Sequence, residues 1–176
     1  MQDATGSVVW ITGLSGAGKT TVAHRVWTAL RERGTPAIYL DGDVLRAMLG
    51  AVEAHSLEQR RALAHSYGRI CAELARQGFT VVCATISMFH DVRRWNREHL
   101  PGYVEIYLRV PVAELTRRDA KGLYAKAAQG AGNMMGLDLP FEEPLTPDLV
   151  IDNFGATDVD AAERLILTLF DKEASS

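Results

Sequence analysis

The sequence has few cysteines, no long apolar run and no surplus of positive charge, and each shortage excludes a class of protein. Its two cysteines, Cys71 and Cys83, stand apart in apolar surroundings, which excludes the spacing of a cysteine metal site. A membrane-spanning helix needs about 18 consecutive apolar residues, and no stretch of the chain approaches that length. A net charge of −3 gives no indication of non-specific nucleic-acid binding. We therefore expect neither a membrane nor a nucleic-acid partner.

The chain also lacks the features of a targeting segment and of a second domain. Its first residues have neither the basic nor the apolar region of a signal peptide, which predicts a cytoplasmic protein. Its 176 residues, 47% of them hydrophobic, are enough for one globular domain with a full core. No internal repeat, low-complexity tract or linker interrupts it. We predict a single domain over residues 1–176.

A glycine-rich motif stands near the N-terminus, between an apolar run at 8–11 and an amphipathic run at 21–33. It reads Gly-x-x-x-x-Gly-Lys-Thr over residues 13–20, the pattern of a phosphate-binding loop. Its glycines let the backbone turn amides inward, and the helix that starts near Lys19 adds a positive dipole end. The alternative, a plain glycine-rich turn, is disfavoured by the spacing and the flanks.

This loop predicts binding of ATP with Mg²⁺. Lys19 should reach the β- and γ-phosphates, and the Thr20 hydroxyl should bind the cation. The expected ATP-binding residues of the loop are Gly13, Ser15, Gly16, Ala17, Gly18, Lys19, Thr20 and Thr21.

Apolar strand-like runs alternate with helical patterns along the chain. The expected strands lie at 8–11, 37–40, 79–84, 104–110 and 149–152, and the expected helices at 21–33, 44–49, 57–77, 90–99, 112–118 and 158–172. This alternation predicts an α/β fold of three layers with a parallel sheet. Ligands bind such sheets at the carboxyl ends of the strands.

Two carboxylates, Asp41 and Asp43, follow the second expected strand and straddle a glycine. One of them can hold Mg²⁺ while the other accepts a proton from an acceptor hydroxyl, as a small-molecule kinase requires. Arg46, one helical turn later, can pair with an anionic group of the acceptor. The alternative is a turn that caps the next helix. The third strand ends without an acid, which favours a kinase over a P-loop hydrolase or switch.

Residues 119–147 fit no regular element and are rich in glycine and proline. A loop of this length inside a compact domain is usually functional, and phosphoryl transfer requires that water be excluded. We therefore predict a lid approximately at 119–147, the alternative being an insertion without function.

Together these motifs resemble the adenylylsulfate kinase family. The matching segments cover nearly the whole chain in order: residues 10–21, 40–46, 118–127 with Lys-Gly-Leu-Tyr, and 147–151. The resemblance implies a P-loop kinase fold with a five-stranded parallel sheet. It implies transfer of the γ-phosphoryl of MgATP to a ribose 3′-hydroxyl. It also implies that Arg118 is a lid arginine near ATP and that Lys121 is a lid lysine near the acceptor.

The acceptor side departs from the family pattern at several positions. His55 and Met134 stand where the family has two phenylalanines, and His90 replaces an arginine, whereas Arg60 is retained. In the family the two aromatic rings stack on adenine, a contact of about 1–3 kcal/mol per ring. An intact ATP side beside a changed acceptor side indicates a different acceptor more than a lost activity.

Two acceptors stay open. Adenylylsulfate is the nominal acceptor of the family, and a subgroup that resembles it phosphorylates cytidine diphosphoramidate on the way to capsule phosphoramidates. His55 and the segments 87–89, 95–98 and 134–136 look closer to that subgroup. Two alternatives also remain: a nucleotide-binding module without turnover, and a kinase for a metabolite such as a sugar acid.

The residues expected to act fall into three groups. Lys19, Asp41 and Asp43 are the catalytic set, and Thr20 with Asp41 forms the metal set. The expected acceptor-binding residues are Asp43, Arg46, His55, Arg60, Ser87, His90, Lys121 and Met134.

The assignments on the last helices are less specific. His90, Arg94 and Arg97 share a helical face that receives the acceptor's anionic tail or is simply solvated, and Arg93 is predicted at the surface. Trp95 belongs to the core or to the wall of the acceptor pocket. The apolar face of the C-terminal helix predicts ordinary packing or the contact of a homodimer.

Overall fold

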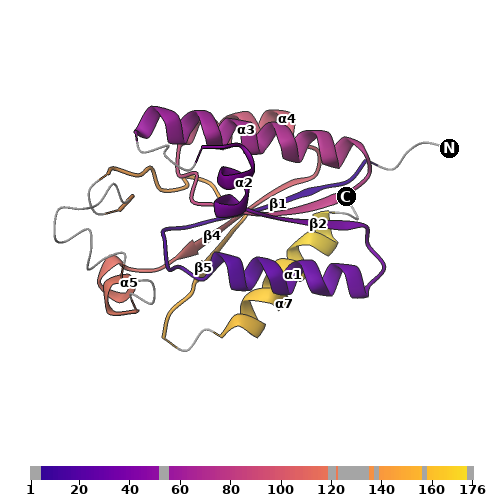
Figure 1. The fold of residues 1–176 in the computed structure, drawn as a ribbon. Coiled ribbons are helices and arrows are strands. Elements are labelled where there is room, and N and C mark those ends of the chain that lie inside the picture. Colours follow the sequence, from indigo (N-terminus) through magenta and orange to yellow (C-terminus); the bar gives the residue numbers. More distant parts are fainter. Residues whose placement is uncertain are drawn as a thin grey trace.

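The computed structural model describes residues 5–51, 56–118, 122, 135–136, 139–155 and 158–173. Within these residues, five parallel strands form one sheet in the order β2-β3-β1-β4-β5, with helices on both faces (Figure 1). The strands are β1 (Val8–Thr12), β2 (Ala37–Asp41), β3 (Thr80–Ala84), β4 (Tyr103–Arg109) and β5 (Leu149–Asp152). The three-layer α/β fold with a five-stranded parallel sheet, which the sequence predicted, is confirmed.

The sheet is built outward from β1, which pairs with β3 on one side and β4 on the other. Every residue of β1 and β3 is buried, as expected for apolar strands that helices cover on both faces. β2 was expected to be a buried strand, but each of its residues is half-buried. It forms the edge of the sheet, so one side of the strand and part of its faces remain open to solvent.

Two helices cover each face of the sheet. α1 (Lys19–Glu32) packs with α7 (Val159–Glu173) on one face, and α3 (Leu57–Arg76) packs with α4 (His90–His99) on the other (Figure 1). α3 begins in a capping box, in which the Ser56 hydroxyl accepts a hydrogen bond from the backbone amide of Gln59 and the side-chain oxygen of Gln59 accepts one from the backbone amide of Ser56. Among the described residues, every helix is too short or too polar to cross a bilayer.

Two short helices lie near the carboxyl ends of the strands. α2 (Gly42–Met48) follows β2 directly, and α5 (Val112–Arg118) follows β4. Asp41 is the N-cap of α2, and its side chain accepts a hydrogen bond from the Asp43 amide. The capping role that the sequence offered as an alternative therefore exists, and it places both carboxylates at the same edge of the sheet.

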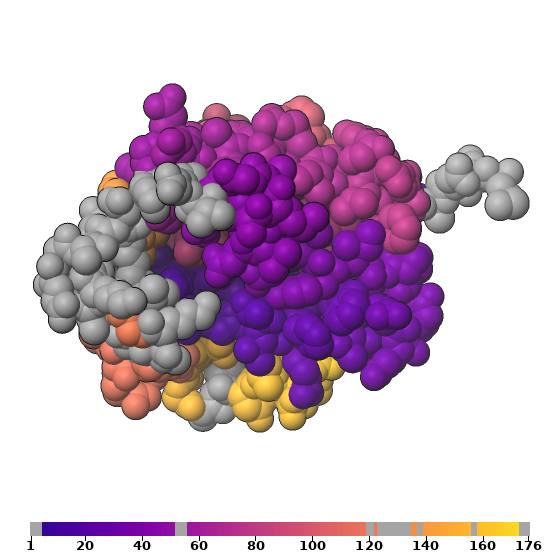
Figure 2. Space-filling view, viewed as in Figure 1, coloured from indigo at the N-terminus to yellow at the C-terminus, as the bar shows by residue number. Residues whose placement is uncertain are grey.

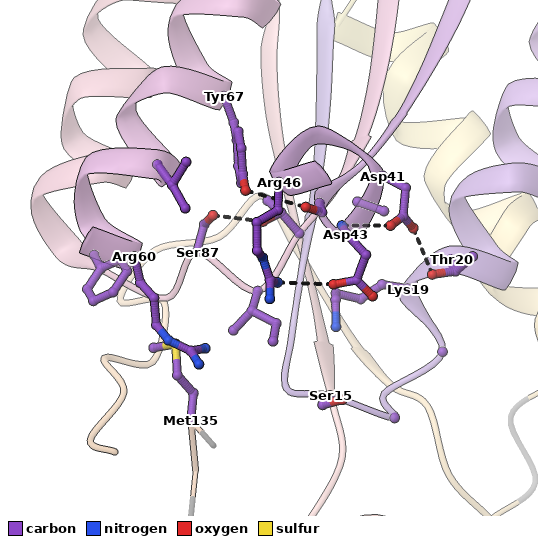
Figure 3. A pocket seen from close by; sticks show the side chains of 18 of the residues that line it. Ser15, Lys19, Thr20, Asp41, Asp43, Arg46, Arg60, Tyr67, Ser87 and Met135 are labelled. Carbon is purple, nitrogen blue, oxygen red and sulfur yellow. Dashed lines mark hydrogen bonds and ion pairs between the residues drawn. The ribbon is translucent and has the colours of Figure 1, made fainter. Parts of the chain in front are cut away.

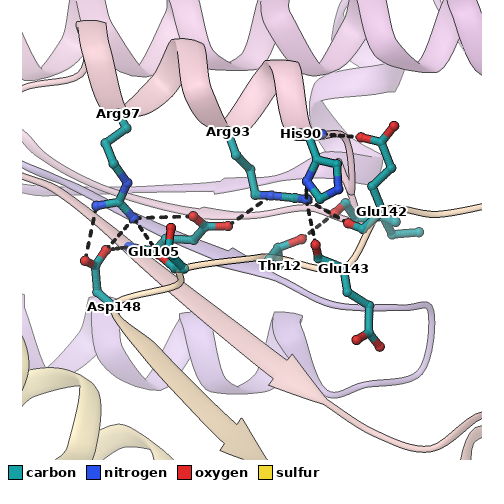
Figure 4. Close-up of polar contacts among 10 residues, drawn as sticks. Thr12, His90, Arg93, Arg97, Glu105, Glu142, Glu143 and Asp148 are labelled. Carbon is teal, nitrogen blue, oxygen red and sulfur yellow. Dashed lines mark hydrogen bonds and ion pairs between the residues drawn. The ribbon is translucent and has the colours of Figure 1, made fainter.

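The prediction that Arg93 lies at the surface was wrong. The residue is 5% exposed, and its guanidinium faces Glu105 of β4, which is 3% exposed (Figure 4). α4 carries few apolar residues, and two of its buried residues, Arg93 and Asn96, are polar, so hydrophobicity alone does not mark Arg93 as buried. The acid that β4 presents to α4 decides which arginine turns inward, because a buried carboxylate requires a compensating charge.

Candidate active site

A cavity of about 260 Å³ lies where β1, β2 and β3 end. In the space-filling view the surface is hollowed beside α2, and the indigo of the N-terminal elements is visible there (Figure 2). The cavity brings together most of the site residues predicted from the sequence: Ser15, Gly16, Gly18, Lys19, Thr20, Thr21, Asp41, Asp43, Arg46, Arg60 and Ser87.

The glycine-rich loop requires its glycines at two close approaches. Gly18 is the N-cap of α1 with a φ of 91°, and a Cβ there would lie 2.6 Å from Nδ2 of Asn153. Asn153 follows β5 and donates a hydrogen bond of 2.8 Å to the Ala17 carbonyl. A Cβ at Gly13 would lie 2.5 Å from the Leu108 carbonyl oxygen. The loop is therefore fixed against two distant segments, with the start of α1 directed at the cavity.

Two side chains that follow the loop face the cavity (Figure 3). Lys19 donates a hydrogen bond of 2.8 Å from its ammonium to the Leu14 carbonyl. The Thr20 hydroxyl donates one of 2.9 Å to Oδ2 of Asp41. A hydroxyl and a carboxylate at this distance are hard oxygen ligands of the kind that Mg²⁺ prefers.

The Asp41 carboxylate receives further donors on both of its oxygens. The Tyr39 hydroxyl donates to Oδ2 at 3.0 Å, and the Asp43 amide donates to Oδ1 at 2.9 Å. Burial by itself raises the pKa of Asp41, but the hydrogen bonds from the Asp43 amide, Thr20 and Tyr39 outweigh it and lower that pKa below its usual value. Asp41 therefore carries a negative charge at neutral pH.

Asp43 faces the cavity beside Arg46, and Arg60 lies farther along the same cavity, near Met135 (Figure 3). The Asp43 carboxylate pairs with the Arg46 guanidinium at 3.0 Å and is well exposed. Burial lowers the pKa of Arg60, and the nearby charge of Arg46 lowers it further. Tyr67 of α3 closes this wall, and its hydroxyl donates to the Gly42 carbonyl at 3.3 Å. Two guanidinium groups that repel each other make this wall attractive to an anion.

The segment after β3 forms the remaining wall. Ser87 adopts a φ of 31°, a left-handed conformation that is unusual for a residue other than glycine. Its hydroxyl hydrogen-bonds that of Thr85 at 2.8 Å. Phe89 also lines the cavity, with the Arg61 guanidinium 4.9 Å from its ring centroid. Met135, 3% exposed, completes the wall.

Tyr39, Tyr67 and Phe89 are among the residues of this site that were not predicted individually, whereas Met135 lies in the segment 134–136 that was already compared with the acceptor subgroup. Tyr67 stands at an apolar position of a helical pattern, which by itself indicates only packing. Phe89 offered a signal, since it stands two residues after Ser87 in a segment that was assigned to the acceptor. Tyr39 also offered a signal, since it stands two residues before Asp41 on an expected strand and so shares its face, but this spacing alone does not predict the hydrogen bond.

Several predicted residues do not line the cavity. Gly13 and Ala17 belong to the phosphate-binding loop but are not among the described residues that line the cavity. His90, predicted to bind the acceptor, lies outside the lining of this cavity: its Nδ1 accepts a hydrogen bond of 2.8 Å from Arg93, and it borders a separate cavity with Arg94 and Arg97. Arg118 of α5 pairs with Glu114 at 2.8 Å. Three predicted residues lie outside the described part of the chain: His55, Lys121 and Met134.

Trp95 is likewise not among the described residues that line the cavity. Its ring stacks on His99 with the centroids 4.5 Å apart, and it meets His65 edge to face. It therefore packs between α3 and α4.

The fold and the site define a class of protein. A phosphate-binding loop leads from the central strand into a helix, and paired carboxylates follow the edge strand β2 of the same parallel sheet, as in a P-loop kinase. Comparison with known proteins identifies the family. A sequence model described as adenylylsulphate kinase matches residues 5–152, so the chain belongs to the adenylylsulphate kinase family and is a kinase.

Relatives of known name cover nearly all of the chain. An adenylyl-sulfate kinase of Paraburkholderia xenovorans is 42% identical over 171 residues, 96% of each chain. A cytidine diphosphoramidate kinase of Campylobacter jejuni is 38% identical over 161 residues, covering 91% of this chain and 94% of its own. Among solved structures, the Mycobacterium tuberculosis APS kinase CysC in complex with AMPPNP and APS superimposes with a TM-score of 0.88 at 33% identity, over 96% of this chain and 99% of its own.

Proposed function

We propose that this kinase transfers the γ-phosphoryl group of ATP to the ribose 3′-hydroxyl of a nucleotide, with adenylylsulfate as the acceptor. The observation that carries the proposal is the composition of one cavity. The phosphate-binding loop lines it together with Asp43, Arg46 and Arg60. The adenylyl-sulfate kinase relative and the solved APS complex support adenylylsulfate as the acceptor at these three residues.

The loop would bind the phosphates of ATP. Its amides and the start of α1 face the cavity, and an anion there gains from the helix dipole. Lys19 already lies at the cavity and would exchange its Leu14 carbonyl for the β- and γ-phosphates. Positive charge held in place stabilises the transferring phosphoryl group without reorganisation during the reaction. Arg118, outside the described lining, is proposed to reach ATP from the lid.

Thr20 and Asp41 would hold Mg²⁺. Their oxygen atoms lie 2.9 Å apart, and Mg²⁺ is commonly bound by one or two carboxylates together with substrate phosphates. When bound, the cation neutralises charge that develops on the β- and γ-phosphate oxygens.

Asp43 would take the proton of the acceptor hydroxyl. Its exposed carboxylate can meet that hydroxyl while Arg46 holds its other side. Arg46 and Arg60 would bind the anionic part of the acceptor, and Ser87 its polar edge. Acceptor contacts by His55, Lys121 and Met134 stay predictions, since these residues lie outside the described part of the chain.

Cytidine diphosphoramidate is the second candidate acceptor. Two observations favour it: the relative of that name matches almost end to end, and His55 and Met134 replace the two aromatic residues of the family pattern. Phe89 supplies an aromatic ring to the cavity that either base could contact.

The broader predictions made from the sequence also belong to this proposal. We propose one kinase domain over residues 1–176, with a lid approximately at 119–147, acting in the cytoplasm. A homodimer contact through α7 stays a prediction. Ala162 and Ile166 of that helix are buried in the core, whereas Leu165 is half exposed.

A coupled assay of ADP release tests the proposal. The enzyme receives MgATP with adenylylsulfate or with cytidine diphosphoramidate, and mass spectrometry identifies the phosphorylated product. Turnover of adenylylsulfate supports the main proposal, and turnover of the cytidine compound alone transfers it to the second candidate. Silence with both, while ATP still binds, would contradict both acceptors and favour a module without turnover. Asp43→Ala provides the blank.

A further inference from the structure

Tyr39 makes a contact in this site that neither the loop motif nor the paired carboxylates account for. Its hydroxyl donates a hydrogen bond of 3.0 Å to Oδ2 of Asp41, the oxygen that also accepts from Thr20 at 2.9 Å. The other oxygen accepts from the Asp43 amide at 2.9 Å. Donors on both oxygens thus fix the plane of the carboxylate. Thr20 and Asp43 are among the described residues that line the cavity, and Tyr39 is not.

The ring of Tyr39 is itself held in place by α1. It meets His24 edge to face with the centroids 5.9 Å apart, and it lies 6.1 Å from the ring of Trp27. The Trp27 indole donates a hydrogen bond of 3.0 Å to the Ala37 carbonyl, which joins α1 to the start of β2. Tyr39 and Asp41 are two residues apart on β2, so their side chains leave the same face of the strand. The hydroxyl therefore reaches Asp41 from a rigid base.

We infer that Tyr39 is a positioning residue, which orients the Asp41 carboxylate so that it and Thr20 can hold the divalent cation of the nucleotide. This role rests on the proposed function. In proteins, the partners that hydrogen-bond a metal ligand fix its orientation, and their loss costs about 10- to 100-fold in metal affinity or activity. Without Tyr39, the Thr20 hydroxyl and the Asp43 amide remain as donors, so we expect an effect at the lower end of this range.

A matched pair of variants isolates the hydroxyl from the ring. Tyr39→Phe keeps the aromatic packing against α1 and removes one donor to a carboxylate. Tyr107→Phe is the control, because the Tyr107 hydroxyl donates to Glu143 at 3.1 Å and is not among the described residues that line the cavity. Each variant loses one hydrogen bond from a tyrosine hydroxyl to a carboxylate, and Tyr39→Phe loses it at the proposed cation site.

The first measurement is the affinity of Mn²⁺ for the protein–ADP complex, followed by the electron paramagnetic resonance signal of free Mn²⁺ and corrected for binding to free ADP. We expect Tyr39→Phe to raise the dissociation constant about tenfold and Tyr107→Phe to leave it unchanged. In activity assays, half-saturation by Mg²⁺ should shift by a similar factor, with kcat at saturating Mg²⁺ changed less than about threefold.

The outcomes separate this inference from the proposed function. If the wild-type complex binds Mn²⁺ and Tyr39→Phe binds it equally well, Tyr39 only packs against α1 and the inference is wrong. If the wild-type protein with ADP retains no Mn²⁺, the proposed cation site fails, and the role of Tyr39 fails with it. A loss of kcat in Tyr39→Phe with unchanged Mn²⁺ affinity also overturns the inference.

Discussion

The carboxylates beside the cavity and the carboxylate beneath α4 are held by different kinds of partner. Asp41 accepts hydrogen bonds from two hydroxyls and an amide, and Asp43 pairs with one arginine while staying well exposed. Glu105 is 3% exposed and lies 3.4 Å from both Arg93 and Arg97 (Figure 4). The cavity carboxylates are half-buried or exposed, whereas Glu105 is buried between two arginines, and this difference gives the two regions different properties.

The electrostatics of the two regions differ in the same way. Hydrogen bonding lowers the pKa of Asp41, whereas burial raises the pKa of Glu105 and lowers that of Arg93 despite their mutual attraction. The Arg93–Glu105 pair thus does not recover the full cost of removing both charges from water. The comparison shows that the carboxylates at the cavity are open enough to bind a new partner. The charged side chains under α4, in contrast, are already paired with one another.

The charged side chains under α4 also join distant parts of the chain. Arg93 donates to the Glu142 and Glu143 carbonyls at 2.8 and 3.1 Å, and Arg97 donates to Asp148 at 3.0 Å. These contacts fix the segment before β5 against α4 (Figure 4). The charged residues under α4 therefore stabilise the packing of α4 against β4 and the segment before β5.

The largest effect is expected from Asp43→Asn at the cavity. Removing a general base costs about 10²- to 10⁴-fold in kcat, while the phosphate-binding loop stays intact. The carboxylate is well exposed, so the free energy of unfolding should change by less than about 0.5 kcal/mol. Steady-state kinetics, ATP binding and urea unfolding measure the three quantities. A variant that retains wild-type kcat would show that Asp43 is not the base.

Arg93→Met should show the opposite pattern, a loss of stability. Breaking a buried ion pair on one side costs about 3–5 kcal/mol, and we expect about 3 because Arg97 still faces Glu105. Urea unfolding gives the value. The double variant Arg93→Met with Glu105→Met should recover most of the loss, since apolar side chains can replace a buried pair.

The exposed pairs of Arg25 with Asp160 and Glu163 provide the control for that measurement. Arg25→Met should leave the midpoint of urea unfolding close to that of the wild type, because solvent screens the charges. Equal losses in Arg25→Met and Arg93→Met would show that burial does not distinguish the two sites.

Phe89→Leu should affect the acceptor side of the cavity and not the ATP side, with some loss of stability because Phe89 is 3% exposed in the core. Leucine fills most of the volume but offers no ring for a base, and base–aromatic stacking contributes about 1–3 kcal/mol. We expect the acceptor KM to rise about 5- to 140-fold with the KM for ATP unchanged. Phe79→Leu, a partly buried phenylalanine before β3 and outside the described lining, is the matched control. A parallel rise in both KM values would contradict a contact with the acceptor.

The smallest effect is a pH dependence at Asp91. Burial raises its pKa, but the hydrogen bond from His65 and the charge of Arg61 outweigh burial and lower it. The lowered pKa means that Asp91 stabilises the fold above the unfolded-state pKa of about 3.9, and that this contribution is lost as the pH falls through the folded-state pKa. Asp91→Asn should therefore be less stable than the wild type by up to about 1 kcal/mol at pH 6, and equally stable near pH 2. Urea unfolding at the two pH values measures it, and a difference that persists at pH 2 would exclude this linkage.

Local sequence determined the helices and strands, and the part of the candidate site that the phosphate-binding loop and the two aspartates form. The apolar run of β1, the glycine spacing and the pattern of α1 are contiguous, so the loop and its neighbours Lys19 and Thr20 follow from residues 8–33 alone. Asp41 and Asp43 were likewise predicted from their position after an expected strand. These features depend on backbone conformation and on chain order, both of which short stretches encode.

Tertiary structure decided which distant side chains complete each cluster. Tyr67, Phe89 and Met135 reach the cavity from three separate segments, and Tyr39 points to Asp41 because α1 packs against its ring. Arg93 turns inward because β4 presents Glu105 to the face that α4 covers. Such choices depend on the charge and shape of surfaces that meet only after folding, and for that reason the periodicity of one helix or strand could not predict them.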